Sequence, residues 1–202
     1  MHGLRVSNHR SQQHEEQLEL INRELKHRIK NLFTIAASIC RQTIKSGGSS
    51  EEMTKAATGR IFAVASAQEL LSVTSAQGAD LVELVDALVR TVAPDPDRLR
   101  VAGASFRLEA QATTPFALIL HELATNALKY GAWSHNGIVA VTWRVKAQML
   151  LFEWREHDGP AIAPPMREGL GSALIKSGLP TATVHHDLKP DGLECRISLP
   201  LA

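Results

Sequence analysis

Apolar residues in the first part of the chain recur at the spacing of amphipathic helices. Between positions 18 and 39 they return at alternating steps of three and four, as on one face of a helix: Leu18, Ile21, Leu25, Leu32, Ile35 and Ile39. We expect this helix to span about residues 9–45, because the glycine- and serine-rich stretch 46–50 would end it. A second helix of about residues 51–75 is predicted by Ala57, Ile61, Val64, Ala65, Gln68 and Leu71. Together they predict an antiparallel helical hairpin, which would form a four-helix bundle in a dimer.

After residues 74–80 the pattern changes to short helices mixed with alternating stretches. A helix should begin at Leu81, and another should run from about Pro115, a favourable first residue, to Tyr130. Alternation predicts one or two strands within 99–110, two strands within 137–157, and two closing strands around a turn at 189–192. This mixture predicts an α+β sandwich with helices on one face of the sheet. The expected domains are a lead-in segment 1–14, the hairpin 15–77 and the sandwich 78–202.

Composition excludes several classes of protein. The net charge is +1 and only 4% of residues are aromatic, which does not favour nucleic-acid binding. No run approaches the roughly 18 apolar residues of a membrane span. The polar N-terminal stretch 1–17 lacks the apolar core of a signal peptide, so a cytoplasmic location is expected.

His27 is the first candidate for chemistry. On a helical wheel that starts at Leu25, it falls at about 200°, on the polar side of the helix. Glu24 and Asn31 lie three and four residues away, so their side chains can reach it. An exposed imidazole oriented by a carboxylate is a good nucleophile. By itself, however, an exposed histidine on a charged helix face is more often ordinary surface.

A second candidate group is a strip along the helix near residue 120. Glu122, Asn126 and Lys129 follow one another at steps of four and three, which places them on one side. The asparagine carbonyl is a ligand suited to Mg²⁺, the lysine can meet phosphate oxygens, and the glutamate can order a water or a metal-bound hydroxyl. A salt-bridged helix face explains the strip equally well when it is considered alone.

The third group lies at a strand end and in the loop after it. Glu156 would end a strand, where its carboxylate can accept a hydrogen bond from an exocyclic amine, and Gly159 allows close backbone approach. Gly169 and Gly171 open a predicted helix whose N-terminal amides would face an anion. Two glycines before a helix are a weak signal by themselves.

Four stretches taken together resemble the HWE family of bacterial sensor histidine kinases. They are "ELKHRIKN" (24–31), "HELATNALKYGA" (121–132), Trp154-Arg155-Glu156 and "GLGSALI" (169–175). They include the histidine and the Trp-x-Glu of the family name, at His121 and at residues 154–156. The resemblance covers about residues 15 to 200 and implies a phosphoacceptor hairpin followed by an ATPase sandwich of the histidine-kinase (GHKL) type.

The resemblance implies an activity and the residues that perform it. His27 would accept the γ-phosphoryl group of ATP and pass it to an aspartate in the receiver domain of a response regulator. The residues that would orient or assist it are Glu24, Arg28, Asn31 and Glu122. Asn126 would bind Mg²⁺, and Glu156 would bond the adenine amine. The remaining nucleotide contacts would be Lys129, Tyr130, Gly159, Gly169 and Gly171.

The sequence departs from the family pattern after Trp-x-Glu. Asp158-Gly159-Pro160 stands where the family has Gly-Gly-Pro, and the added carboxylate would either repel triphosphate or hold a loop. The segment between Pro160 and Gly169 is also short, which leaves little chain for a lid over ATP.

Other functions remain open at this point. One is a phosphotransfer protein whose ATPase-like domain is inactive and which relays phosphate between response regulators. Another is a serine kinase of the anti-sigma type, which would not need His27. The expected partners are a receiver domain, an upstream sensor domain or sensor protein, and a second copy of the chain bound through the hairpin. Since few residues precede the hairpin, we expect either a kinase core taken from a longer chain or a stand-alone kinase.

Overall fold

The computed structural model describes residues 29–30, 32–41, 43–45, 47–73, 78–160, 179, 181–189 and 192–201. The chain forms two compact units, Met1–Gln42 and Thr43–Ala202. In the first unit the described residues 29–30 and 32–41 are helical, as predicted. The predicted phosphoacceptor group lies outside the described residues: Glu24, His27, Arg28 and Asn31.

The helix α2 (Ser50–Val73) begins at a capping box and opens one residue before the predicted start. The Ser49 backbone N–H donates to Glu52 at 2.8 Å, and the Glu52 backbone N–H donates to the Ser49 hydroxyl at 3.2 Å. These two bonds satisfy N–H groups that a helix start otherwise leaves unpaired, and they lower the pKa of Glu52.

The buried face of α2 differs from the predicted stripe. Val64 and Leu71 are buried as expected, but Ile61 is 45% exposed. Arg60, which lies four residues before Val64 on the same side, is only 7% exposed. The prediction weighted hydrophobicity alone, whereas the face that packs on α4 includes a buried charge.

A five-stranded mixed sheet has the order β2-β4-β5-β7-β6. Its strands are β2 (Leu99–Ala102), β4 (Ile138–Lys146), β5 (Met149–His157), β6 (Thr183–Lys189) and β7 (Gly192–Pro200). β2 pairs with β4 in parallel and the other pairs are antiparallel. Both predicted hairpins are therefore confirmed. A second, two-stranded sheet joins β1 (Ala79–Asp80) to β3 (Arg107–Leu108).

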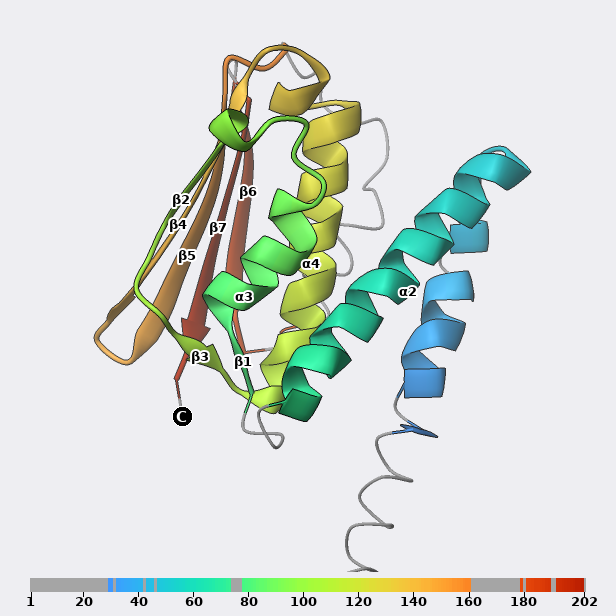
Figure 1. The fold of residues 1–202 in the computed structure, drawn as a ribbon, viewed down its shortest axis with the longest axis horizontal. Helices are drawn as coiled ribbons and strands as arrows, with labels where there is room; N and C mark the ends of the chain where they lie inside the picture. Colours follow the sequence, from blue (N-terminus) through green and yellow to red (C-terminus); the bar gives the residue numbers. More distant parts are fainter. Residues whose placement is uncertain are drawn as a thin grey trace, which may run out of the picture. The chain divides into compact units, whose positions relative to one another are not determined.

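Figure 1 shows α3 (Leu81–Val85) and α4 (Ala110–Lys129) on the same face of the five-stranded sheet. α3 continues as the π-helical segment η1 (Asp86–Arg90), and the 3-10 turns η2 (Pro96–Arg98) and η3 (Ala132–Ser134) flank the sheet. Between α4 and the sheet, the rings of Phe116 and Phe152 meet edge to face at 5.1 Å. The predicted α+β sandwich is thus confirmed. Within the described ranges, no helix combines the length and apolar composition that crossing a bilayer requires.

The helix α4 begins at Ala110, five residues before the predicted start, so Pro115 lies inside it. Proline has no N–H, and this position forgoes the helical bond to the carbonyl four residues earlier. The first turn, which precedes the proline, is closed by the carbonyl of Glu109, which accepts bonds from the backbone N–H groups of Ala112 and Thr113, both at 3.0 Å. Burial of Phe116, Ile119 and the residues that follow holds the helix on the sheet despite that loss.

Candidate active site

The predicted strip on α4 grades from buried to exposed. Glu122 is 7% exposed, Asn126 is half-buried and Lys129 is exposed. On the adjoining side of α4, Ile119, Leu123 and Ala127 are buried in the core. This face fixes the rotation of the helix, and hence the side on which the strip lies.

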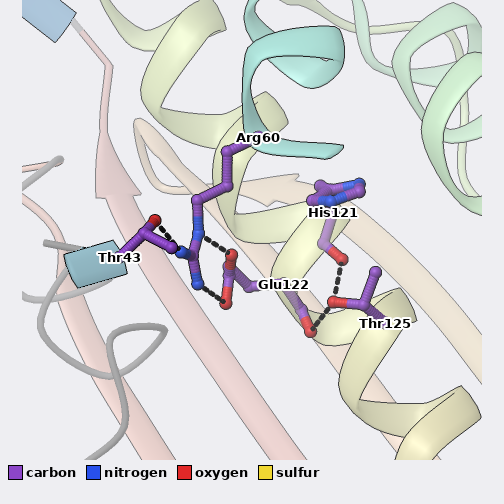
Figure 2. Close-up of polar contacts among 5 residues, drawn as sticks. All are labelled: Thr43, Arg60, His121, Glu122 and Thr125. Carbon is purple, nitrogen blue, oxygen red and sulfur yellow. Dashed lines mark hydrogen bonds and ion pairs between the residues drawn. The ribbon is translucent and has the colours of Figure 1, made fainter. Parts of the chain in front are cut away.

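Glu122 forms a buried ion pair with Arg60 of α2 (Figure 2). The Arg60 Nε donates to Oε1 of Glu122 at 2.6 Å, and its Nη2 donates to Oε2 at 3.2 Å. The remaining nitrogen, Nη1, donates to the hydroxyl of Thr43 at 2.8 Å. Both side chains of the pair are 9% exposed. Buried charges are tolerated when they are paired and hydrogen-bonded in this way.

Arg60 is not among the site residues predicted from the sequence. A signal was present, because Arg60 stands at the same helical spacing as Val64, Ala67 and Leu71, all of which are buried. A charge at a buried position of an amphipathic helix requires a partner. The sequence does not show that the partner is Glu122, which lies 62 residues further along the chain.

His121 lies beside this pair and touches α2 directly. A Cβ built on Gly59 would come within 2.6 Å of the His121 Nε2, so only glycine allows this approach without a shift of the ring. Burial lowers the pKa of His121; the charges of Arg60 and Lys129 add to this shift, and the carboxylate of Glu122 opposes it. The family histidine therefore serves here as a contact between α2 and α4.

Asn126 lies in the last turn of α4. Its backbone carbonyl accepts hydrogen bonds from the N–H groups of Tyr130 at 2.8 Å and Gly131 at 3.0 Å, which end the helix. Its side-chain amide has no hydrogen-bond partner in the part of the chain that the structure describes. An available neutral carbonyl oxygen is suited to Mg²⁺, which keeps most of its ligands as waters and phosphate oxygens.

Glu156 meets the C-terminal end of α4 from β5. Its carboxylate is 2% exposed and accepts hydrogen bonds from the Ala132 N–H at 2.7 Å and the Trp154 Nε1 at 3.3 Å. Burial raises the pKa of Glu156, and these two bonds partly offset the shift. The fold thus brings the 121–132 and 154–156 stretches together. A carboxylate has about four acceptor positions, so two bonds leave room for a further donor.

Asp158, which stands where the family pattern has glycine, adopts a backbone conformation that favours glycine. Its φ is +56°, in the left-handed region that glycine enters freely and that aspartate tolerates better than most residues. The side chain is exposed at the end of β5, next to the half-buried Gly159. Gly169 and Gly171 lie outside the described residues.

Comparison with known proteins agrees with this geometry. Residues 24–105 match the sequence profile of the HWE histidine kinases. The blue-light-activated histidine kinase of Brucella ovis is 30% identical over 166 residues, which are 79% of this chain and 34% of that protein. The protein of the same name in Brucella anthropi is 30% identical over 191 residues, 90% of this chain and 39% of that protein. The chain spans about a third of the length of these relatives.

Solved structures show the same fold. The Erythrobacter litoralis EL346 blue-light activated histidine kinase aligns with a TM-score of 0.68 at 16% identity, over 87% of this chain and 59% of that one. Its histidine kinase domain aligns with a TM-score of 0.59 at 15% identity, over 83% of this chain and 94% of that domain. The fold agrees with that of these kinases, and the sequence matches define the chain as a histidine kinase core. Within that class, the chain belongs to the HWE family.

Proposed function

We propose that this chain is an ATP-dependent protein-histidine kinase that phosphorylates its own His27 and then phosphorylates an aspartate of a response regulator. The observation that carries the proposal is the strip on α4, which runs from Glu122 through Asn126, whose amide is unpaired among the described residues, to the exposed Lys129. Glu156 lies beyond its end, on β5. Family membership supplies the reaction class.

In this proposal each residue of the site has a separate task. The carboxylate of Glu156 bonds the adenine amine, and the ammonium of Lys129 neutralises phosphate charge. Asn126 would hold Mg²⁺, which when bound would supply charge neutralisation at the phosphate oxygens. The bond from the γ-phosphorus to the bridging oxygen of ADP breaks, an imidazole nitrogen of His27 forms the new bond, and Glu122 accepts the released proton.

Further expectations concern the partners of the chain and its location. Ile44 is 70% exposed and Phe62 is 58% exposed, which supports homodimer formation through this helical region. Light scattering at several concentrations should show a dimer, and a monomer at every concentration would contradict it. A receiver domain and a sensor domain or sensor protein complete the proposed signalling pathway, in the cytoplasm.

Incubation with ATP that is labelled at its γ-phosphate tests the proposed reaction. Wild-type protein incubated with Mg²⁺ and ATP should acquire an acid-labile label, and both His27→Ala and Asn126→Ala should lose it. His185→Ala is the matched control, because His185 is exposed on β6 and lies outside the site. It should label like the wild type.

The other outcomes separate the alternatives. Label on His27→Ala, or acid-stable label on a partner protein, contradicts histidine autophosphorylation. If no nucleotide binds at millimolar ATP but phosphate is accepted from a phosphorylated regulator, the chain is a phosphotransfer protein.

A further inference from the structure

We infer that Arg60 is a positioning residue for phosphoryl transfer, which acts by holding the carboxylate of Glu122 in an ion pair that must open before Glu122 can work. The inference rests on the proposed function, because it concerns the same reaction. It assigns a role to a residue of α2, outside the strip on α4. The relevant contacts are those of Figure 2.

Both carboxylate oxygens of Glu122 are already occupied. Arg60 binds Glu122 in a bidentate manner: its Nε donates to Oε1 at 2.6 Å and its Nη2 donates to Oε2 at 3.2 Å. A carboxylate that orders a water or accepts a proton must turn a lone pair toward that group at hydrogen-bonding distance. With the guanidinium facing both oxygens and the side chain 9% exposed, Glu122 is withheld from an incoming group.

The guanidinium of Arg60 is itself fixed. Its third nitrogen, Nη1, donates to Thr43 at 2.8 Å, so all three guanidinium nitrogens are engaged. A planar guanidinium held at three points has one orientation, and that orientation determines where the Glu122 carboxylate lies. A shift of α2 relative to α4 would separate the pair without any change within α4.

The contact between α2 and α4 does not depend on this pair alone. The Gln68 amide donates to the Thr114 hydroxyl at 3.0 Å, two turns further along α2. Ala63 and Ala67 are fully buried between Arg60 and that bond. The pair can therefore open locally while the rest of the interface keeps the helices together. Release of Glu122 then needs only a local movement around Arg60, near the middle of α2.

A purely structural role of Arg60 and a positioning role lead to different expected results. If Arg60 only stabilised the fold, its replacement would lower both stability and activity. If Arg60 withholds Glu122, its replacement lowers stability but raises the rate of phosphoryl transfer. The two roles therefore differ in the sign of the change in kcat.

The experiment measures autophosphorylation kinetics and thermal unfolding of the full chain. Arg60→Gln should raise kcat about fivefold or more, the lower end of the range for energetic coupling between linked groups, with little change in the KM for ATP. Glu122→Gln should lose activity, and the double variant Arg60→Gln/Glu122→Gln should match Glu122→Gln. Arg60→Lys keeps the charge but loses the two-pronged contact, so it should give an intermediate kcat. It also carries the test if Arg60→Gln does not fold.

Gln68→Leu is the matched control, because it weakens the same interface without touching Glu122. It should lower the unfolding temperature and leave kcat unchanged. The inference is overturned if a folded Arg60 variant labels at or below the wild-type rate, or if Gln68→Leu raises kcat as much as Arg60→Gln. Failure of the proposed function is distinguishable from these outcomes, because the wild type itself would then acquire no acid-labile label.

Discussion

Gly59 of α2 lies in direct contact with the imidazole of His121 on α4. A Cβ at position 59 would stand 2.6 Å from Nε2 and 2.9 Å from Cε1 of that ring. The two helices can approach this closely only because one of them has no side chain at the contact.

Gly59→Ala should therefore destabilise the protein, although alanine is the better helix former. Forcing the ring aside costs about 1–3 kcal/mol, against a gain of about 1 kcal/mol in helix propensity. In a His121→Ala background the clash is absent, and the same substitution should stabilise by about 1 kcal/mol. Denaturant unfolding of the wild type, the two single variants and the double variant measures both changes in the free energy of unfolding. Equal effects of Gly59→Ala in the two backgrounds would show that the ring does not limit the contact.

The lowered pKa of His121 makes stability depend on pH in a known direction. The folded state holds the imidazole neutral more strongly than the unfolded state, whose pKa is the ordinary value of 6.5. The unfolded chain thus binds the proton first as pH falls, so this contribution is present above pH 6.5 and is lost as pH falls through the folded-state pKa. Unfolding free energies of wild type and His121→Asn should diverge most above pH 6.5 and converge in acid. A constant difference between the two would refute this.

Removal of the Glu156 carboxylate should damage the fold as well as the proposed contact with adenine. Glu156→Ala leaves the Ala132 N–H and the indole N–H of Trp154 without their acceptor. Each buried donor left unsatisfied costs about 1–3 kcal/mol. Glu156→Gln keeps one acceptor oxygen and should lower the free energy of unfolding by less. Because it remains more stable, it is the matched control when ATP binding is measured. Calorimetry would contradict this account if Glu156→Ala unfolded at the wild-type temperature.

Asp158 allows a test of why the sequence departs from glycine. At a φ of +56°, Asp158→Gly should stabilise by about 1 kcal/mol, and Asp158→Asn should be close to neutral, because asparagine also tolerates this conformation. Denaturant unfolding measures the order of stability of the wild type and the two variants. A destabilised Asp158→Gly would contradict the expected order. An effect of charge on the KM for ATP would appear equally in both variants, whereas a backbone effect would appear in Asp158→Gly alone.

Local patterns predicted most of the sandwich. The alternation in 137–157 is strong enough to define β4 and β5, and their turn falls at Ala147 and Gln148, both at positive φ. The start of α4 was misplaced because proline is favoured at a first helical turn, whereas here tertiary burial of Phe116 and Ile119 extends the helix past it. Local preference is a weaker term than core packing at that position.

The candidate site was predictable in part. The spacing of Glu122, Asn126 and Lys129 on one helix follows from the sequence, since it depends only on helical geometry. The pairing of Glu122 with Arg60 does not, because it depends on how two helices distant in sequence dock. The acceptor of the Ala132 N–H could also not be predicted without the fold, because Glu156 lies on β5 and reaches it from there.

Location of the phosphoryl group on the protein tests the central claim most directly. Wild-type chain incubated with Mg²⁺ and ATP, kept at alkaline pH and fragmented for tandem mass spectrometry, should carry one phosphoryl group, on His27, and lose it in acid. The chain has nine histidines, so the assignment is discriminating. Phosphate on another histidine, acid-stable phosphate on serine or threonine, or bound ATP without any phosphorylated residue would contradict the account.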